Sequence, residues 1–159
     1  PFKALQLIQD LRHKGIDVIL HFYGNGVLKD ELEQKIKSEQ LEESVFVYGN
    51  QPKEKVQKAL YYSHFMVLPS RSEGWPKAVA EAMFWGCIPV VPRISCVPWM
   101  LGEGDRGILM NDQDLATTAR QIKSLLLEPE KLEKMAQQAA HWSQEYTLDK
   151  FEEEIKKLL

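Results

Sequence analysis

Short apolar runs alternate along this chain with longer segments in which apolar residues recur at intervals of three and four. The short runs predict buried strands, and the longer segments predict amphipathic helices. Strands and helices that alternate in this way form a parallel sheet covered on both faces, and right-handed crossovers make it a Rossmann-like, doubly wound α/β fold. The strands are expected at residues 17–23, 44–48, 64–68, 88–91 and 107–110, and the helices at 2–14, 27–40, 53–62, 76–85, 112–127, 129–145 and 148–159.

The beginning of the chain departs from this alternation. Pro1 is followed within a few residues by a helical pattern, whereas an α/β domain normally begins with a strand. We therefore expect that the first strand precedes Pro1 and that the chain is cut from a longer protein. Residues 1–159 then form one domain, with the helices of residues 129–159 packed on or beside it. The last helix carries an apolar stripe of Phe151, Ile155, Leu158 and Leu159.

The composition is that of a soluble globular protein, with 159 residues of which 44% are hydrophobic and 27% charged. The formal net charge of −3 lacks the basic excess that binds nucleic acid. No apolar stretch approaches the roughly 20 residues of a membrane-spanning helix, and no signal-peptide pattern opens the chain. Cys87 and Cys96 have no zinc-ligand spacing, so we expect reduced thiols, no metal site and a cytoplasmic protein.

Glu73 and Glu81 stand eight positions apart, after the apolar run of residues 64–68. Glu73 lies in a loop of turn residues, and Glu81 lies inside the helix that follows. Gly74 permits a positive φ or close backbone approach, and Pro76 suits the first helical position. Free N–H groups at that helix N-terminus favour an anion. Two acids beside them suit a ligand that is both anionic and rich in hydroxyls, such as a nucleotide-sugar.

The spacing alone leaves a simpler interpretation open. Glu73 could stabilise the helix N-terminus through its dipole, and Glu81 could pair with Lys77 one turn earlier, which is worth about 0.3–0.5 kcal/mol. A helical projection places Glu81 opposite the side expected to meet the sheet, with Phe84 and Trp85 near it, so another helix, a ligand or a further domain covers this surface. The side expected to meet the sheet consists of Val79, Ala82, Met83 and Gly86.

The segment from Glu73 to Gly86 closely resembles the signature E-G-[FW]-x-x-x-x-x-E-A-M-x-x-G of family 4 glycosyltransferases, the glycosyl transferases group 1. In both, a Pro-Val-Val strand start follows, here at Pro89–Val91. The resemblance implies a retaining GT-B enzyme, of which this chain is the C-terminal, donor-binding domain. Weaker matches extend it across most of the chain, at Gly24–Gly26, Val45–Gly49 and Met66–Ser70.

The resemblance also implies roles for the matched residues. Glu81 would hold the ribose hydroxyls, and Glu73 would position the donor hexose by hydrogen bonds rather than act as a nucleophile. A front-face mechanism, in which the leaving phosphate assists the acceptor, depends on preorganised charge stabilisation and needs no metal or other cofactor. The diphosphate or the sugar would lie on Gly74, Trp75, Pro76 and Lys77, and the base beside Val47, Gly49, Asn50 and Gln51.

The partners implied by the resemblance are a UDP- or GDP-sugar, an acceptor glycan or lipid-linked acceptor, and an N-terminal domain of the same protein that this chain lacks. The pathway would be polysaccharide or cell-envelope glycan synthesis, in the cytoplasm, with membrane contact through the other domain. We expect the 159 residues alone to be inactive. Two alternatives stay open: a non-catalytic nucleotide- or protein-binding module on the same fold, and a GT-B epimerase or inverting transferase.

Three features depart from the family pattern. The family usually places an Arg and a Lys on the diphosphate shortly before the first helix, so that pair would precede Pro1, and Lys3 sits too close to the helix start to replace it. Trp75–Lys77 stands where a Phe-Gly start is commoner, which bears on donor choice. The turn before Pro89 is one residue longer than in the commonest pattern.

The other candidate motifs do not predict a second ligand site. Gly24–Gly26 would need a third glycine at Lys29 for a dinucleotide fingerprint, so NAD is not expected. His21 and His64 are interpreted as structural residues in or beside buried strands, because the histidines share no ligand spacing. Val97–Met100 is interpreted as a loop that packs apolar side chains near the cleft.

Overall fold

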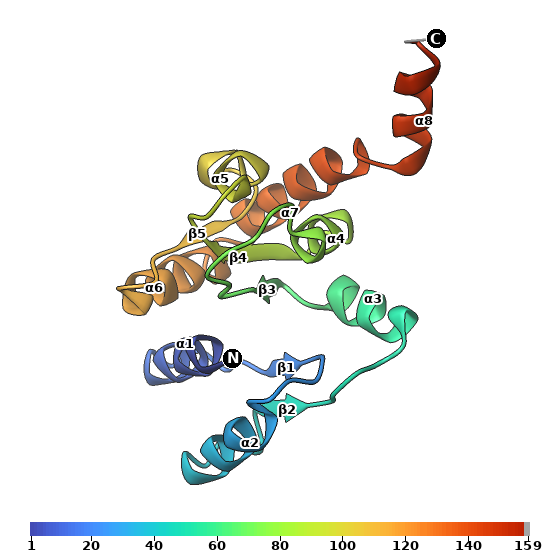
Figure 1. Ribbon diagram of the computed structural model, residues 1–159. Coiled ribbons are helices and arrows are strands. Elements are labelled where there is room, and N and C mark those ends of the chain that lie inside the picture. Colours follow the sequence, from blue (N-terminus) through green and yellow to red (C-terminus); the bar gives the residue numbers. More distant parts are fainter. Residues whose placement is uncertain (158–159) are drawn as a thin grey trace.

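The computed structural model describes residues 1–157 and contains each helix and strand that the alternation predicts, mostly shorter at the ends (Figure 1). The strands are β1 (Leu20–Phe22), β2 (Val45–Val47), β3 (Phe65–Val67), β4 (Ile88–Pro92) and β5 (Ile108–Met110). The helices are α1 (Phe2–His13), α2 (Lys29–Ser38), α3 (Lys53–Tyr62), α4 (Lys77–Phe84), α5 (Val97–Met100), α6 (Leu115–Leu126), α7 (Pro129–Gln144) and α8 (Leu148–Lys156).

Helix α5 contradicts the prediction that Val97–Met100 forms a loop. Pro98 stands in its first turn, where a proline fits a helix without losing a hydrogen bond. The last carbonyl groups of this short helix have a partner further along the chain, because the Arg106 guanidinium donates to the carbonyl oxygens of Trp99 at 2.8 Å and Met100 at 3.0 Å. Local propensity does not reveal such a contact, so the helix was missed.

All five strands are parallel, as predicted, but they form two separate ladders. Strand β1 pairs with β2, starting with Leu20 beside Val45. Strands β3, β4 and β5 form the second sheet in that order, with β4 at its centre. Strands β1 and β3 face each other across the gap between the two ladders, and residues of both line the main cavity.

Alternate residues of the strands point to opposite faces and build separate parts of the core. Val90 packs in a cluster with α1 and α6, whereas Val91 packs with α4, α5 and α7. A third cluster places α1 and α2 over one face of β1 and β2. The helices therefore cover both faces of the sheet, as a doubly wound fold requires.

Strand β3 is less buried than its sequence predicts. Every residue of β4 is buried, whereas Phe65, Met66 and Val67 of β3 are each only partly buried. His21 and His64 are both exposed, so the interpretation that they belong to buried strands is wrong. In each case the cause is the gap between the two ladders, which leaves one edge of β1 and of β3 without a neighbouring strand.

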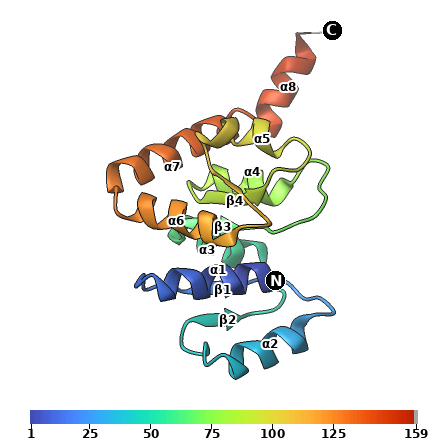
Figure 2. The same ribbon diagram turned by 90° about the vertical axis from the view of Figure 1, so that its left-hand side faces the viewer.

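Helix α7 packs along α4, and a hydrogen bond joins the two where the Ser143 hydroxyl donates to the Ala80 carbonyl oxygen at 2.6 Å. Helix α8 then points away from the remaining helices in both views (Figures 1 and 2). Ile155 of its expected apolar stripe is exposed. Leu158, Leu159 and the side chain of Phe151 lie outside the described residues.

Cys87 is buried and unpaired, as predicted for a reduced core thiol, and burial raises its pKa to about 12. Cys96 is also a free thiol and is half-buried. Across residues 1–157, each helix is too short or too polar to cross a membrane.

Candidate functional site

The loop between β3 and α4, residues 68–76, lies at the carboxyl end of the parallel strands. In Figure 2 this loop, the loop after β1 and Pro1 all lie on the same side of the molecule. Ligands of doubly wound folds bind at this end of the sheet, where the strand order reverses. The structure therefore places Glu73 where the sequence predicts a ligand site, on the loop that follows β3.

The backbone of this loop offers a row of unused hydrogen-bond donors. Within the described chain, the amide N–H groups of residues 70–75, 77 and 78 donate no hydrogen bond, and Pro69 and Pro76 have none to donate. Helices α6 and α8, by contrast, begin with side-chain caps from Asp114 and Thr147. Exposed N–H groups at a helix N-terminus, together with the helix dipole, bind anions such as phosphate.

Gly74 is held by contacts from another loop. Its carbonyl oxygen accepts hydrogen bonds from the Ser95 hydroxyl at 3.1 Å and the Cys96 thiol at 3.2 Å. A positive φ, one of the two reasons suggested for a glycine here, is not observed. The space where a Cβ atom would stand holds no heavy atom within 4 Å, so a ligand could approach the backbone closely at this point.

An aromatic cluster lies beside this loop. The Trp75 ring is 6.0 Å from that of Trp99 and 6.3 Å from that of Trp142, and Tyr146 packs 4.6 Å from Trp142, all measured between ring centroids. The Arg106 guanidinium lies 5.0 Å from the centroid of Trp142. The cluster joins the end of α7 and the helix α5 to the loop, and it fixes the position of the segment that carries Glu73.

The charged side chains of the loop are accessible. Glu73 is half-buried, whereas Arg71 and Lys77 are exposed. Within the described residues, Arg71, Lys77 and Glu73 take part in no ion pair. Two unpaired cations beside the free amide groups make this end of the site suitable for an anionic ligand, and the Glu73 carboxylate can accept hydrogen bonds from hydroxyl groups.

Glu81 lies on α4 and lines the main cavity, whose volume is about 700 Å³, together with Ala78 of the same helix. Val79, Ala82 and Met83 form the fully buried side of α4, as the helical projection predicts. Glu81 forms no ion pair with Lys77 in the described chain, so the simpler interpretation of an intrahelical pair does not apply. Its carboxylate is free to accept hydrogen bonds from a ligand.

The predicted base region lies at the carboxyl ends of β1 and β2. Gly49 has a φ of +65° and is buried, and its carbonyl oxygen accepts from the Gly24 amide at 2.8 Å. The Asn50 side chain accepts from the Asn25 amide at 3.0 Å. Val47 ends β2, and the Gln51 side chain donates to the Tyr48 carbonyl oxygen at 2.8 Å. The contacts of Gly49 and Asn50 join the turn after β2 to the turn after β1.

Sequence reasoning missed the residues that support the loop: Ser95, Cys96, Trp99, Arg106 and Trp142. They stand between 21 and 68 positions from Gly74 or Trp75, so no local pattern joins them. Only the parallel order of β3 and β4 indicates that the loops after both strands meet at one end of the sheet. Among the described residues, no cluster of three or more His, Cys, Asp or Glu side chains could hold a metal ion.

Comparison with known proteins agrees with the fold. The sequence profile of the family described as glycosyl transferases group 1 matches residues 1–142. An uncharacterized glycosyltransferase of Haemophilus influenzae is 28% identical over 161 residues, which cover 98% of this chain and 44% of that protein. A GDP-mannose:cellobiosyl-diphosphopolyprenol alpha-mannosyltransferase of Xanthomonas oryzae is 26% identical over 99 residues, which cover 62% of this chain and 26% of that protein.

Solved structures have the same fold. The crystal structure of Anabaena Alr3699/HepE in complex with UDP superposes with a TM-score of 0.82 at 19% identity, over 99% of this chain and 45% of that one. At this identity the likeness shows the fold alone, and it confirms the predicted Rossmann-like domain. The chain spans less than half the length of each of these three proteins.

Proposed function

Because the chain belongs to the glycosyl transferases group 1 family, we propose that it is the donor-binding domain of a retaining GT-B glycosyltransferase. The whole protein would move a hexose from a nucleotide-diphosphate sugar to a hydroxyl acceptor. The observation that carries the proposal is the row of free amide groups between residues 70 and 78 at the carboxyl end of the sheet, with the Glu73 carboxylate within the row and the Glu81 carboxylate shortly after it.

Each part of the donor has a suitable partner in this arrangement. The diphosphate would lie on the free amide groups from Gly74 to Ala78, with Arg71 and Lys77 nearby to balance its charge. Glu81 would accept hydrogen bonds from both ribose hydroxyls, and Glu73 would accept them from the hexose. Charge-assisted hydrogen bonds of this kind are worth about 1.5–3 kcal/mol each.

The backbone amides and cations supply the charge stabilisation that the departing diphosphate needs, so we propose that the reaction requires no metal or other cofactor. The base would lie against Val47, Gly49, Asn50 and Gln51, at the carboxyl end of β2. Because Alr3699/HepE is solved with UDP and the Xanthomonas relative is named for GDP-mannose, the donor would be a UDP- or GDP-sugar. The name of the Xanthomonas relative specifies an alpha-mannosyl product, which fits a retaining reaction on an α-linked donor.

The acceptor would be a glycan or a lipid-linked glycan bound by the N-terminal domain of the full-length protein, in polysaccharide or cell-envelope synthesis. The enzyme would work in the cytoplasm, with membrane contact through that domain. Transfer would require both domains, so the 159 residues alone should not turn over. Sustained transfer by this chain by itself would contradict that division of roles.

Binding measurements on the full-length protein can separate the two carboxylates. Glu81→Gln should lower the affinity for UDP or GDP itself by roughly 10-fold to 100-fold, which corresponds to the loss of one charge-assisted hydrogen bond. Glu73→Gln should leave the affinity for the free nucleotide unchanged and lower only the affinity for the nucleotide-sugar. Glu130→Gln, an exposed carboxylate in the first turn of α7, is the matched control and should match the wild type.

Titration calorimetry with UDP, GDP, UDP-glucose and GDP-mannose measures these differences. Identical affinities for Glu81→Gln and Glu130→Gln would remove the ribose assignment. If no nucleotide binds to the wild type, the result supports the alternative of a non-catalytic protein-binding module. Nuclear magnetic resonance of the product anomer decides between retention and inversion, and an unchanged acceptor with an altered donor would identify an epimerase.

A further inference from the structure

The loop that carries Glu73 receives two hydrogen bonds from a distant part of the chain, and both end on one atom. The Ser95 hydroxyl at 3.1 Å and the Cys96 thiol at 3.2 Å donate to the Gly74 carbonyl oxygen. Within the described chain, no other hydrogen bond reaches residues 70–75. The position of this loop therefore depends on two donors that share one acceptor.

The two donors stand in the turn between β4 and α5, and α5 contacts the next residue of the loop. The Trp99 ring lies 6.0 Å from the Trp75 ring, measured between ring centroids. We call residues 95–99 the anchor segment. It contacts residue 74 through the carbonyl group and residue 75 through the side chain. The peptide group between these two residues is therefore held from one side.

The direction of the Gly74 carbonyl group determines the direction of the amide group that follows it. The peptide bonds of the described chain are trans, and the C=O and N–H bonds of a trans peptide group point in opposite directions. Because the Gly74 carbonyl group points toward the anchor segment, the Trp75 N–H group points away from it. That N–H group donates no hydrogen bond within the described residues, so a ligand can accept from it.

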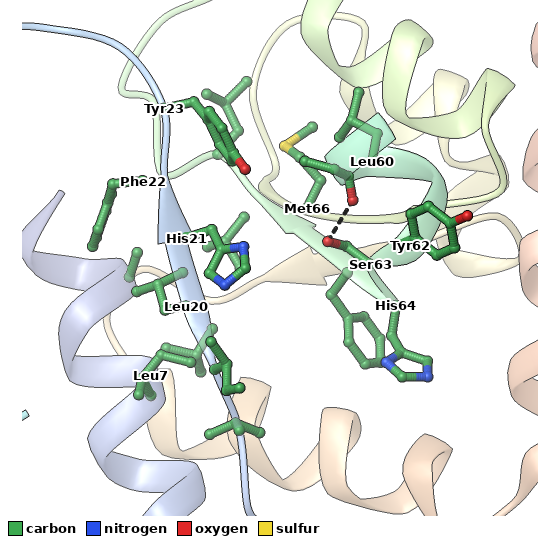
Figure 3. A pocket seen from close by; sticks show the side chains of 18 of the residues that line it. Leu7, Leu20, His21, Phe22, Tyr23, Leu60, Tyr62, Ser63, His64 and Met66 are labelled. Atoms are coloured by element: carbon green, nitrogen blue, oxygen red, sulfur yellow. Dashed lines mark hydrogen bonds between the residues drawn. The ribbon is translucent and has the colours of Figure 1, made fainter. Parts of the chain in front are cut away.

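The main cavity lies on the side of α4 that the anchor segment does not contact. Val97 of the anchor segment packs with Val79 of α4 in one buried cluster. Glu81 of the same helix lines the main cavity, which lies between β1 and β3 (Figure 3). The lining of that cavity includes no residue of the anchor segment. A ligand that contacts Glu81 therefore approaches the loop from the side that the anchor segment leaves open.

Ser95 has a backbone conformation that favours glycine. Its φ of +47° lies in the left-handed region, where a residue with a Cβ atom costs free energy. The hydrogen bond from Ser95 to Gly74 is exposed, so water would satisfy the carbonyl oxygen if the hydroxyl were absent. A strained serine that makes one exposed hydrogen bond indicates that its hydroxyl contributes the direction of the loop rather than stability.

We propose that Ser95 and Cys96 are positioning residues, which hold the Gly74 carbonyl group so that the Trp75 N–H group is directed at the diphosphate of the donor. The inference rests on the proposed function, in which the free amide groups of this loop bind the diphosphate. A donor that is already oriented stabilises an anion without a reorganisation cost, whereas a loop that must first be ordered loses affinity. Neither side chain has to contact the donor itself.

Binding to the full-length protein tests this role through the ratio of two affinities. Ser95→Gly removes the hydroxyl and relieves the strained φ. It should lower the affinity for UDP or GDP by about threefold to tenfold, as the loss of one hydrogen bond does. The affinity for uridine or guanosine, which have no phosphate, should stay unchanged, and Tm should not fall. The double variant Ser95→Gly with Cys96→Ala should lose more affinity for the nucleotide than Ser95→Gly alone.

Gln40→Gly is the matched control, because Gln40 also has a positive φ, of +55°, and is exposed at the end of α2. It relieves the same kind of strain far along the chain from the loop, so the ratio of nucleotide to nucleoside affinity should equal that of the wild type. An unchanged ratio in the double variant of Ser95 and Cys96 would overturn the proposal. Equal losses of affinity for nucleotide and nucleoside would also overturn it, because they indicate a general structural defect.

Backbone relaxation measured by nuclear magnetic resonance without a ligand separates this inference from the proposed function. In the double variant, the order parameters of Gly74 and Trp75 should fall from about 0.85, typical of rigid backbone, to below about 0.6. Those of residues 79–83, inside α4, should not change. Unchanged values at Gly74 and Trp75 would overturn the proposal whatever the protein binds. If the values fall but the wild type binds no nucleotide, the proposed function and the diphosphate target are wrong, while the hold on the loop is confirmed.

Discussion

The same glycine-to-alanine change should have opposite effects on stability at Gly107 and at Gly74. A Cβ atom at Gly107 would stand 2.9 Å from the Pro89 carbonyl oxygen and 3.0 Å from both methyl groups of Leu101. The carbonyl belongs to the central strand β4 and cannot move aside without disturbing its ladder. Overpacking of this kind destabilises a core by about 1–3 kcal/mol. For a chain of this size, that lowers Tm by about 2–12 °C.

At Gly74 nothing lies within 4 Å of the Cβ position, and φ is not positive. Alanine there restricts the unfolded chain and should stabilise the fold by about 0.4–1 kcal/mol. Thermal unfolding of this chain, followed by circular dichroism, measures both effects against the wild type. A Tm for Gly107→Ala equal to that of the wild type, or a larger loss at Gly74 than at Gly107, would refute the reasoning from packing.

Two further predictions concern the core. Burial raises the pKa of Cys87 from its ordinary value of 9.0 to about 12, so its contribution to stability is complete below pH 9 and declines by about 1.4 kcal/mol per unit as the pH rises toward 12. The free energy of unfolding, measured with urea between pH 8 and pH 10.5, should fall less steeply with pH for Cys87→Ala than for the wild type. Equal slopes for the two proteins would contradict this prediction. Ser143→Ala removes the hydrogen bond to Ala80 and should destabilise by about 1 kcal/mol. The control Ser124→Ala, whose hydroxyl is exposed, should change the free energy of unfolding by less than about 0.5 kcal/mol in the same experiment.

Periodicity alone was enough to predict the order and type of nearly every element, because each strand and helix has its own apolar pattern. Helix α3, for example, spans the predicted residues 53–62. Periodicity could not predict α5, whose terminal carbonyls depend on Arg106, a residue outside the helix. It also could not predict the partial burial of β3, since burial depends on which strands are present on either side and not on the strand's own sequence.

The sequence predicted where the two carboxylates of the candidate site lie, but not the contacts that support the loop around them. The placement of Glu73 in the loop and of Glu81 inside α4 follows from the turn residues and the helix pattern between them. The supporting contacts from Ser95, Cys96 and the aromatic cluster could not be predicted, because they join segments that only the tertiary fold brings together. The roles of the two carboxylates stay predictions until the binding measurements are made.

The aromatic cluster gives the molecule a spectroscopic reporter of its own. Three of the four tryptophans, Trp75, Trp99 and Trp142, lie within 6.3 Å of one another beside the loop that carries Glu73. The fourth, Trp85, packs against Tyr61 on α3 instead. Intrinsic fluorescence therefore comes mainly from one location, and the close rings should couple and produce a strong exciton signal in circular dichroism. A movement of this loop on ligand binding can be followed with no added label, and replacing Trp85 with phenylalanine would leave a signal from the candidate site alone.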